Sequence, residues 1–142
     1  MLACATISEE NLYKAISIAQ KYKLAEIRLD LCQFTSKEIN VVFSGHNNLI
    51  ATYRNGTDSV EKVHTLKRAI DAGAAYVDIE ANFDKAYRDE IIEYANARGT
   101  GIVYSYHNYQ SMDDISSLRD IIKQGKSFGA KYIKIAVKAS TK

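Results

Sequence analysis

The 142-residue chain contains no proline and only seven glycines. It therefore offers few places for a linker or a low-complexity segment, and residues 1–142 are expected to form a single domain. The two cysteines, Cys4 and Cys32, are too few for a disulfide framework or a four-cysteine zinc site. Each follows or lies among apolar residues, so both are expected to be buried, reduced thiols.

The sequence also lacks an apolar run long enough to cross a bilayer, and its start has no charged region followed by a long apolar one. No membrane partner and a cytoplasmic location are therefore expected. The 19 basic and 17 acidic residues are interspersed along the chain and leave a net charge of +2. Because no basic run or stripe is present, nucleic acid is not an expected partner. The content of 46% hydrophobic and 25% charged residues is typical of a globular domain.

Short apolar runs with the length of a buried strand recur six times along the chain. Segments with apolar residues at helical spacing lie between them. Ser8, Ser36 and Asp84 are placed to begin helices, whereas Gly73, Gly99 and Gly129 are placed to end them. The predicted strands are Leu2–Ile7, Ala25–Leu29, Leu49–Tyr53, Ala75–Glu80, Gly101–Tyr106 and Tyr132–Val137.

The regular alternation of strand and helix predicts an α/β fold with parallel strands. A doubly wound nucleotide-binding sheet would need a glycine-rich first turn, but this chain has Thr6-Ile7-Ser8-Glu9 there. The repeat of roughly 25 residues per unit instead fits a (β/α)8 TIM barrel. The chain supplies about six of the eight units, so we expect it to be part of a longer one. Expressed alone, it is expected to be nearly inactive and to associate through its open strand edges.

Charged residues alternate with apolar ones near the ends of several predicted strands. In Glu26-Ile27-Arg28-Leu29-Asp30 the three charged side chains are expected to point toward the barrel axis. The stretches Thr52-Tyr53-Arg54 and Asp78-Ile79-Glu80 continue this pattern. A structural salt-bridge network or an edge strand with one solvated face would also explain it. Because barrel enzymes place their active sites at the carboxyl ends of the strands, a polar catalytic pocket is the functional interpretation.

Two residues on the last two strands have the chemistry of catalytic groups. His107 ends the fifth strand, where an imidazole with a pKa near neutrality is suited to general acid/base catalysis. Lys134 interrupts an apolar strand, and burial there is expected to lower its pKa and produce an amine able to attack a ketone. The alternative for Lys134 is a structural ion pair with Glu26 or Glu80. His46 and His64 are assigned no role.

These motifs, taken in order and joined by Lys134-Ile135-Ala136, resemble type I 3-dehydroquinate dehydratases over the whole chain. The resemblance implies a lyase of the shikimate pathway, in aromatic amino-acid biosynthesis, that converts 3-dehydroquinate into 3-dehydroshikimate and water. It implies that Lys134 forms a Schiff base with the substrate and that His107 transfers protons. Glu26, Arg28 and Arg54 are implied to bind the substrate. The resemblance further implies a homodimer that needs neither a metal nor another cofactor.

The chain departs from the family pattern at one position. The family usually carries a Glu four residues after the arginine of strand three, where this chain has Asp58. The family's substrate-carboxylate arginine and lid residues lie beyond Lys142. The alternative functions are a related Schiff-base barrel, such as a class I aldolase, and a truncated barrel that binds a ligand without turnover.

Overall fold

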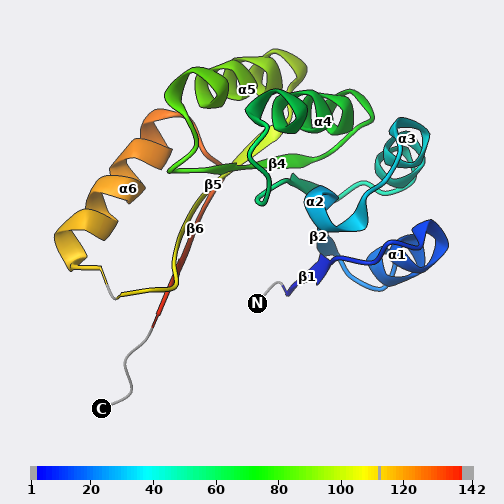
Figure 1. Ribbon diagram of the computed structural model, residues 1–142, viewed down its shortest axis with the longest axis horizontal. Coiled ribbons are helices and arrows are strands. Elements are labelled where there is room, and N and C mark those ends of the chain that lie inside the picture. Colours follow the sequence, from blue (N-terminus) through cyan, green and yellow to red (C-terminus); the bar gives the residue numbers. More distant parts are fainter. Residues whose placement is uncertain (1–2, 112, 139–142) are drawn as a thin grey trace.

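Six parallel strands lie side by side in the order of the sequence and form one sheet. In the computed structural model, which describes residues 3–111 and 113–138, the sheet curls into an open half-barrel with helices on its convex side (Figure 1). The strands are β1 (Cys4–Ile7), β2 (Leu24–Arg28), β3 (Leu49–Thr52), β4 (Tyr76–Glu80), β5 (Gly101–Asn108) and β6 (Tyr132–Val137). The helices are α1 (Leu12–Ala19), α2 (Leu29–Cys32), α3 (Ser36–Ser44), α4 (Ser59–Asp71), α5 (Lys85–Arg98) and α6 (Ile115–Ser127).

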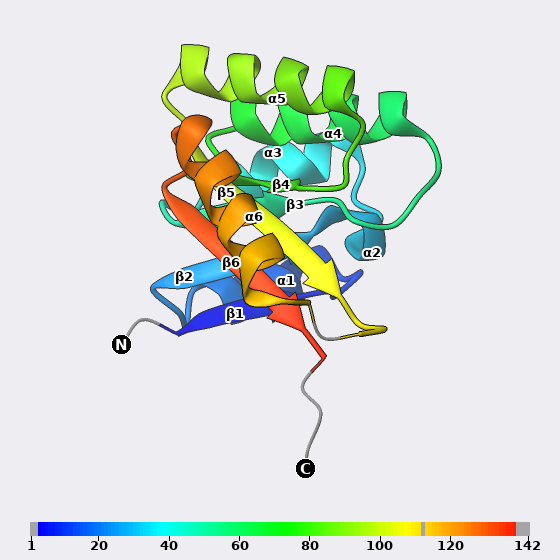
Figure 2. The ribbon, with the colours of Figure 1, turned by 90° about the vertical axis from the view of Figure 1, so that its left-hand side faces the viewer.

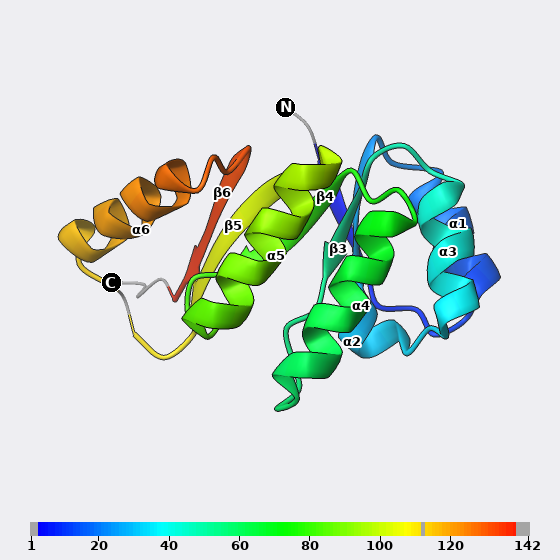
Figure 3. The same cartoon turned by 90° about the horizontal axis from the view of Figure 1, so that it is seen from above.

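This arrangement confirms the expected parallel α/β barrel architecture, of which residues 3–111 and 113–138 supply six strands. Figure 3 shows α6, α5, α4, α3 and α1 following one another around the arc, and Figure 2 shows α6 lying over β5 and β6. Each helix connects two neighbouring strands, as right-handed crossovers in a parallel sheet require. No helix among residues 3–111 and 113–138 is long and apolar enough to span a membrane.

The hydrophobic core lies between the sheet and the helices. Successive side chains of a strand point to opposite faces, so one residue in two faces the helices. Ile27, Val77 and Tyr104 are completely buried on this convex side. Leu66 of α4 and Ile91 of α5 are buried against the same core. The alternate residues of the strands are left to line the concave face.

Several predicted boundaries move by a few residues. Strand β2 ends at Arg28, and the next four residues form the short helix α2, so Asp30 does not continue the strand. Strand β3 ends at Thr52, which leaves Arg54 in the following loop. The predicted start of the first strand at Leu2 lies outside the described residues. Strand β5 is longer than predicted and runs through His107 to Asn108.

The predicted helix ends are correct for the glycines and for one of the three caps. Asp84 caps α5, but Asn11 caps α1 in place of Ser8, and Thr35 caps α3 in place of Ser36. Thr35 is preferred because its side chain and that of Glu38 form a reciprocal capping box. Gly99 ends α5 in the left-handed conformation, and Gly73 and Gly129 follow α4 and α6 with positive φ.

The two cysteines have different environments. Cys32 is buried, as predicted, and its thiol lies 3.6 Å from the carbonyl oxygen of Ile7. Burial raises the pKa of Cys32 to about 11, so the thiol is inert near neutral pH. The prediction of a buried Cys4 is wrong: this residue is exposed. It lies on edge strand β1 with its side chain toward the open concave face, where no helix covers it.

Helix α6 approaches the sheet closely at one residue, Gly125. A Cβ atom there would lie 2.9 Å from Cδ1 of Tyr104 and 3.1 Å from Cγ1 of Ile133. Tyr104 is completely buried, and its hydroxyl donates a hydrogen bond of 2.6 Å to Gln124 of the same helix. The aromatic ring therefore has no room to move away from a larger residue at position 125.

Gly125→Val is expected to lower the free energy of unfolding by about 1–3 kcal/mol because it overpacks this contact. Lys123→Val is the matched control, since the Lys123 side chain is 79% exposed and the same β-branched residue is introduced into the same helix. The comparison is made by urea denaturation. Because valine is a better helix former than glycine, a loss in Gly125→Val no larger than that in Lys123→Val would show that the contact with Tyr104 is not overpacked.

Candidate active site

The concave face of the sheet carries polar side chains contributed by every strand. Glu26 and Arg28 come from β2, His107 from β5 and Lys134 from β6, whereas Arg54 extends from the loop after β3. The parallel register places Thr6 beside Glu26 and Ser105 beside Lys134. The five site residues predicted from the sequence therefore lie at one end of one face. Glu26, Arg54 and Lys134 form a first contact group and His107 forms a second one with Glu80, whereas Arg28 pairs with Asp30 outside both groups.

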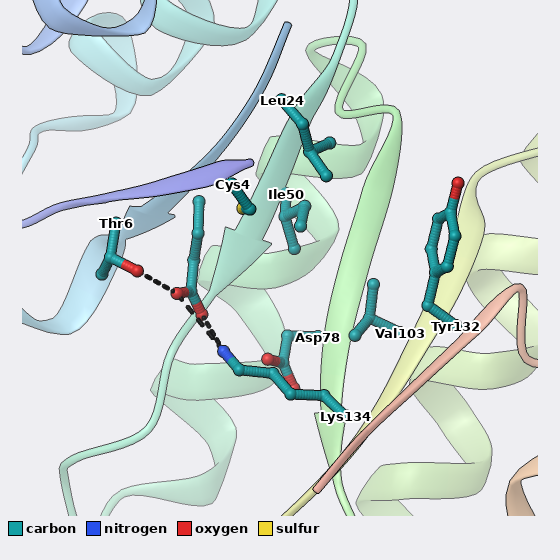
Figure 4. A pocket seen from close by; sticks show the side chains of 9 residues that line it. Cys4, Thr6, Leu24, Ile50, Asp78, Val103, Tyr132 and Lys134 are labelled. Carbon is teal, nitrogen blue, oxygen red and sulfur yellow. Dashed lines mark hydrogen bonds and ion pairs between the residues drawn. The ribbon is translucent and has the colours of Figure 1, made fainter. Parts of the chain in front are cut away.

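The carboxylate of Glu26 is the centre of the first group. Thr6 and Thr52 each donate a hydroxyl hydrogen bond of 2.9 Å to it. The guanidinium of Arg54 lies 3.1 Å away. The amine of Lys134 lies 3.3 Å away (Figure 4). Burial by itself favours the neutral acid, but Lys134, the two hydroxyls and Arg54 together lower the pKa of Glu26 below its ordinary value. The side chain, 3% exposed, is thus held as an anion.

Lys134 is more accessible than predicted. Its side chain is 40% exposed, so the expectation of a buried lysine is wrong. The reason is that Lys134 points into the open concave side of the sheet, where Figure 4 shows it extending toward Asp78 and the β2 carboxylate. The ion pair with Glu26 confirms one of the two pairings considered for this lysine. A ligand on the concave face can reach the amine.

Asp78 lies behind the first group at the centre of β4. Ser105 donates a hydrogen bond to one of its oxygens, and Nη2 of Arg54 lies 3.5 Å from the other. Burial raises the pKa of Asp78 to about 6, although Ser105, Lys134 and Arg54 favour the charged form. Near pH 6 the carboxyl group of Asp78 is therefore partly protonated, next to the side chain of Lys134.

His107 belongs to the second group, nearer the carboxyl ends of the strands. Its side chain is 7% exposed, and Nδ1 lies 3.7 Å from Oε1 of Glu80. Neither ring nitrogen has a hydrogen-bond partner among the described residues. Burial, followed by the positive charges of Arg54 and Lys134, lowers the pKa of His107 to about 4. The imidazole is consequently neutral near pH 7 and able to accept a proton.

Arg28 and Asp30 form a bidentate pair, with nitrogen–oxygen distances of 3.0 and 2.7 Å. The backbone N–H of Asn55 donates to the same Asp30 carboxylate, so the pair ties α2 to the loop after β3. Such a fork holds the guanidinium of Arg28 in a fixed orientation. Asp58 does not join this site: it is exposed, and its carboxylate caps α4 by accepting from the N–H groups of Val60 and Glu61.

A cavity of about 320 Å³ lies on the concave face. Cys4, Leu24 and Tyr132 line its apolar part, and Glu26 and Lys134 line its polar end. Because the apolar residues belong to the amino-terminal halves of the strands, this space reaches Lys134 from the side opposite His107. Arg28, Glu80 and His107 lie on the other side of the Lys134 amine, at the carboxyl ends of the strands. Barrel enzymes bind their substrates at these strand ends. We therefore place the candidate site on that side.

Sequence reasoning assigned no role to Thr6, Ser105 or Lys62. Thr6 and Ser105 could have been found from the parallel register, because each lies one strand away from a predicted site residue. Lys62 lies on a helix, four residues after the helix cap, and nothing in its sequence context marks it as buried. Among the described residues, no group of three or more His, Cys, Asp or Glu side chains is arranged to hold a metal ion.

The fold and this site define the protein as a parallel α/β-barrel protein with a lysine–carboxylate pair on its concave face. The sequence model of one family, type I 3-dehydroquinase, matches residues 3–142. The chain belongs to the type I 3-dehydroquinase family.

Individual relatives agree with the family match. The chain is 27% identical to a 3-dehydroquinate dehydratase of Methanocaldococcus jannaschii, over 95% of this chain and 67% of that protein. It is 29% identical to one of Methanococcus maripaludis, over 90% of this chain and 63% of that protein. The crystal structure of a type I 3-dehydroquinate dehydratase from Clostridium difficile superimposes with a TM-score of 0.87 at 19% identity, which shows the shared fold. The superposition covers 99% of this chain and 64% of the Clostridium difficile chain. The chain thus spans about two thirds of the length of these proteins.

Glu26→Gln is expected to lower the free energy of unfolding by about 1–3 kcal/mol at neutral pH, because two hydroxyl donors and two cations lose a buried anion. Glu90→Gln is the matched control. It removes the same charge from an exposed pair with Lys67, which is worth less than about 1 kcal/mol.

The acid dependence of this loss follows from the pKa of Glu26. Since the folded-state pKa lies below the ordinary value of 4.5, the stabilisation is fully present above pH 4.5 and disappears as the pH falls through the folded-state pKa. The difference between the wild-type protein and Glu26→Gln, measured by denaturant titration at several pH values, should therefore shrink below pH 4.5. A difference that stays constant or grows in acid would contradict the buried-anion assignment.

Proposed function

We propose that this protein is a 3-dehydroquinate dehydratase that removes water from 3-dehydroquinate through a Schiff base on Lys134. The observation that carries the proposal is the placement of Lys134 and His107 in a chain of the type I 3-dehydroquinase family. The reachable lysine lies beside Ser105, and the neutral histidine lies two residues further along the same neighbouring strand. An amine for imine formation and a base for proton removal are thus on adjacent strands.

The first step joins the substrate to the protein. After the ammonium group of Lys134 has lost a proton to solvent, the amine attacks the ketone carbon, and loss of water from that carbon gives an imine. Glu26, which lies 3.3 Å from Nζ, fixes the direction of the lysine side chain before attack. The protonated imine then attracts electrons from the neighbouring carbon.

The second step is the elimination. His107 removes a proton from the carbon beside the imine, and the resulting electron pair moves toward the imine nitrogen. The departing hydroxyl takes a proton from the imidazolium and leaves as water. Hydrolysis of the product imine consumes one water, releases 3-dehydroshikimate and restores Lys134, so the overall change is the loss of one water molecule.

Arg28, Arg54 and Glu26 are proposed to contact the substrate's hydroxyl groups. Arg54 already bridges Glu26 and Asp78, with its Nη2 atom 3.1 and 3.5 Å from their carboxylate oxygens. A substrate hydroxyl that accepts from Arg54 would therefore be oriented by a group that is itself held in place. The place of the reaction in the shikimate pathway, the cytoplasmic location and the homodimer stay predictions.

When the complete, longer chain is used, borohydride added with 3-dehydroquinate is expected to reduce the imine and attach the ligand mass permanently to Lys134. The measurement is mass spectrometry of the digested protein. Lys134→Ala should abolish the adduct, whereas Lys131→Ala, which removes an exposed lysine just before the same strand, should leave it unchanged. An adduct at Lys131 or Lys138 would contradict the assignment to Lys134. No adduct at all would exclude the Schiff-base mechanism and favour a barrel that binds without turnover.

His107→Ala is expected to slow product formation by about 10²–10⁴-fold while still allowing the imine to form, because proton transfer is lost and the amine is kept. The adduct trapped at Lys134 should accumulate in this variant. His64→Ala is the control, since His64 is exposed on α4 and outside both contact groups. Normal turnover by His107→Ala would mean that another group is the base.

A further inference from the structure

Lys62 is a charged side chain that is buried although it lies on a helix, α4. Its side chain is 8% exposed, and lysine is rarely buried unless it is paired. The amine of Lys62 lies 3.2 Å from Oε2 of Glu80 and 4.3 Å from the centre of the Phe83 ring. The N-cap Asp58 starts α4, and its carbonyl oxygen accepts from the backbone N–H of Lys62. The first turn of α4 thus places the positive charge of Lys62 beside Glu80, at the carboxyl end of β4.

Glu80 connects this cation to the histidine of the candidate site. Its two oxygens face different partners: Oε2 pairs with Lys62, and Oε1 lies 3.7 Å from Nδ1 of His107. That second distance is slightly beyond a hydrogen bond, as expected for a neutral imidazole whose nitrogens lack partners. The centre of the Tyr109 ring lies 6.0 Å from that of the imidazole.

We propose that Lys62 and Glu80 are a positioning pair for His107. Protonation of His107 turns both ring nitrogens into donors, and the Glu80 carboxylate is placed to accept from Nδ1. Nε2, which has no hydrogen-bond partner among the described residues, is then left for proton transfer with the substrate. Lys62 pairs with the other carboxylate oxygen, 3.2 Å away, and so keeps the Glu80 carboxylate turned toward Nδ1. The pair deepens the proposed dehydratase function and rests on it for its catalytic meaning.

The charges around His107 explain why such a pair is needed. Arg54 from the loop after β3, Lys134 from β6 and Arg28 from β2 all disfavour the imidazolium, and only Glu26 among the largest influences favours it. Three cations against one anion would make proton removal by His107 costly. A second carboxylate directly behind Nδ1 offsets part of that cost at the moment when the proton arrives.

The first test is a nuclear magnetic resonance titration of the imidazole groups without substrate. The chain has three histidines, and the His107 signal is identified by its loss in His107→Ala. Glu80→Gln, which keeps the size of the side chain, is expected to lower the pKa of His107. Glu90→Gln removes the same charge from the pair that joins α4 to α5 and should leave it unchanged. An unchanged His107 pKa in Glu80→Gln would overturn the proposal.

The second test follows the decay of the Lys134 adduct into product. Glu80→Gln and Lys62→Met are expected to slow it about 10–100-fold, the range typical of partners that orient a working histidine. Lys62→Arg, which keeps the cation, should restore most of the rate, and Lys67→Met is the control for a lost lysine on the same helix. In a His107→Ala background, Glu80→Gln should cause no further loss. An equal loss in both backgrounds would show a merely structural role.

The two tests separate this inference from the proposed function. The titration needs neither substrate nor turnover, so a shifted His107 pKa supports the pairing even if no adduct forms at Lys134. Conversely, normal adduct formation and decay in Glu80→Gln would leave the dehydratase function standing and remove the positioning pair.

Discussion

The buried carboxylate of Glu26 is the interaction on which the concave face depends. An unpaired charge in this position would cost several kcal/mol, so the anion requires partners from other strands. Thr6 of β1, Thr52 of β3 and Lys134 of β6 supply them, which ties the first strand to the last across the open side of the arc. The chemistry of the site is therefore built from the same contacts that fix the curvature of the sheet.

Two titratable groups of the site respond to pH in opposite directions. His107 has an ordinary pKa of 6.5 and a folded-state pKa of about 4, so between these values the unfolded chain binds more protons and stability falls as the pH falls. Asp78 has an ordinary pKa of 3.8 and a folded-state pKa of about 6, so it stabilises the folded state as the pH falls through about 6. Burial causes both shifts because it penalises the charged form of either group. The two effects partly offset each other between pH 6 and pH 4.

The sequence predicted the architecture well because strands with period-two alternation and amphipathic helices are local patterns. It also predicted that Glu26, Arg28, Arg54, His107 and Lys134 gather at one face, since parallel strands bring their carboxyl ends to the same edge. The prediction failed where a strand ended earlier than its alternating pattern suggested. Asp30, for example, leaves the strand alternation because the chain turns into α2 and the carboxylate pairs with Arg28.

By itself, the sequence determined the order of strands and helices, the positions of the helix-ending glycines and the residue types that can carry imine and proton-transfer chemistry. Only the tertiary structure decided which charges meet. It paired Lys134 with Glu26, gave Glu80 to Lys62 and used Asp58 as a helix cap. The reason is that periodicity fixes which face a side chain occupies, whereas the partner of a charge depends on strand register and helix packing, which bring together residues far apart in the chain.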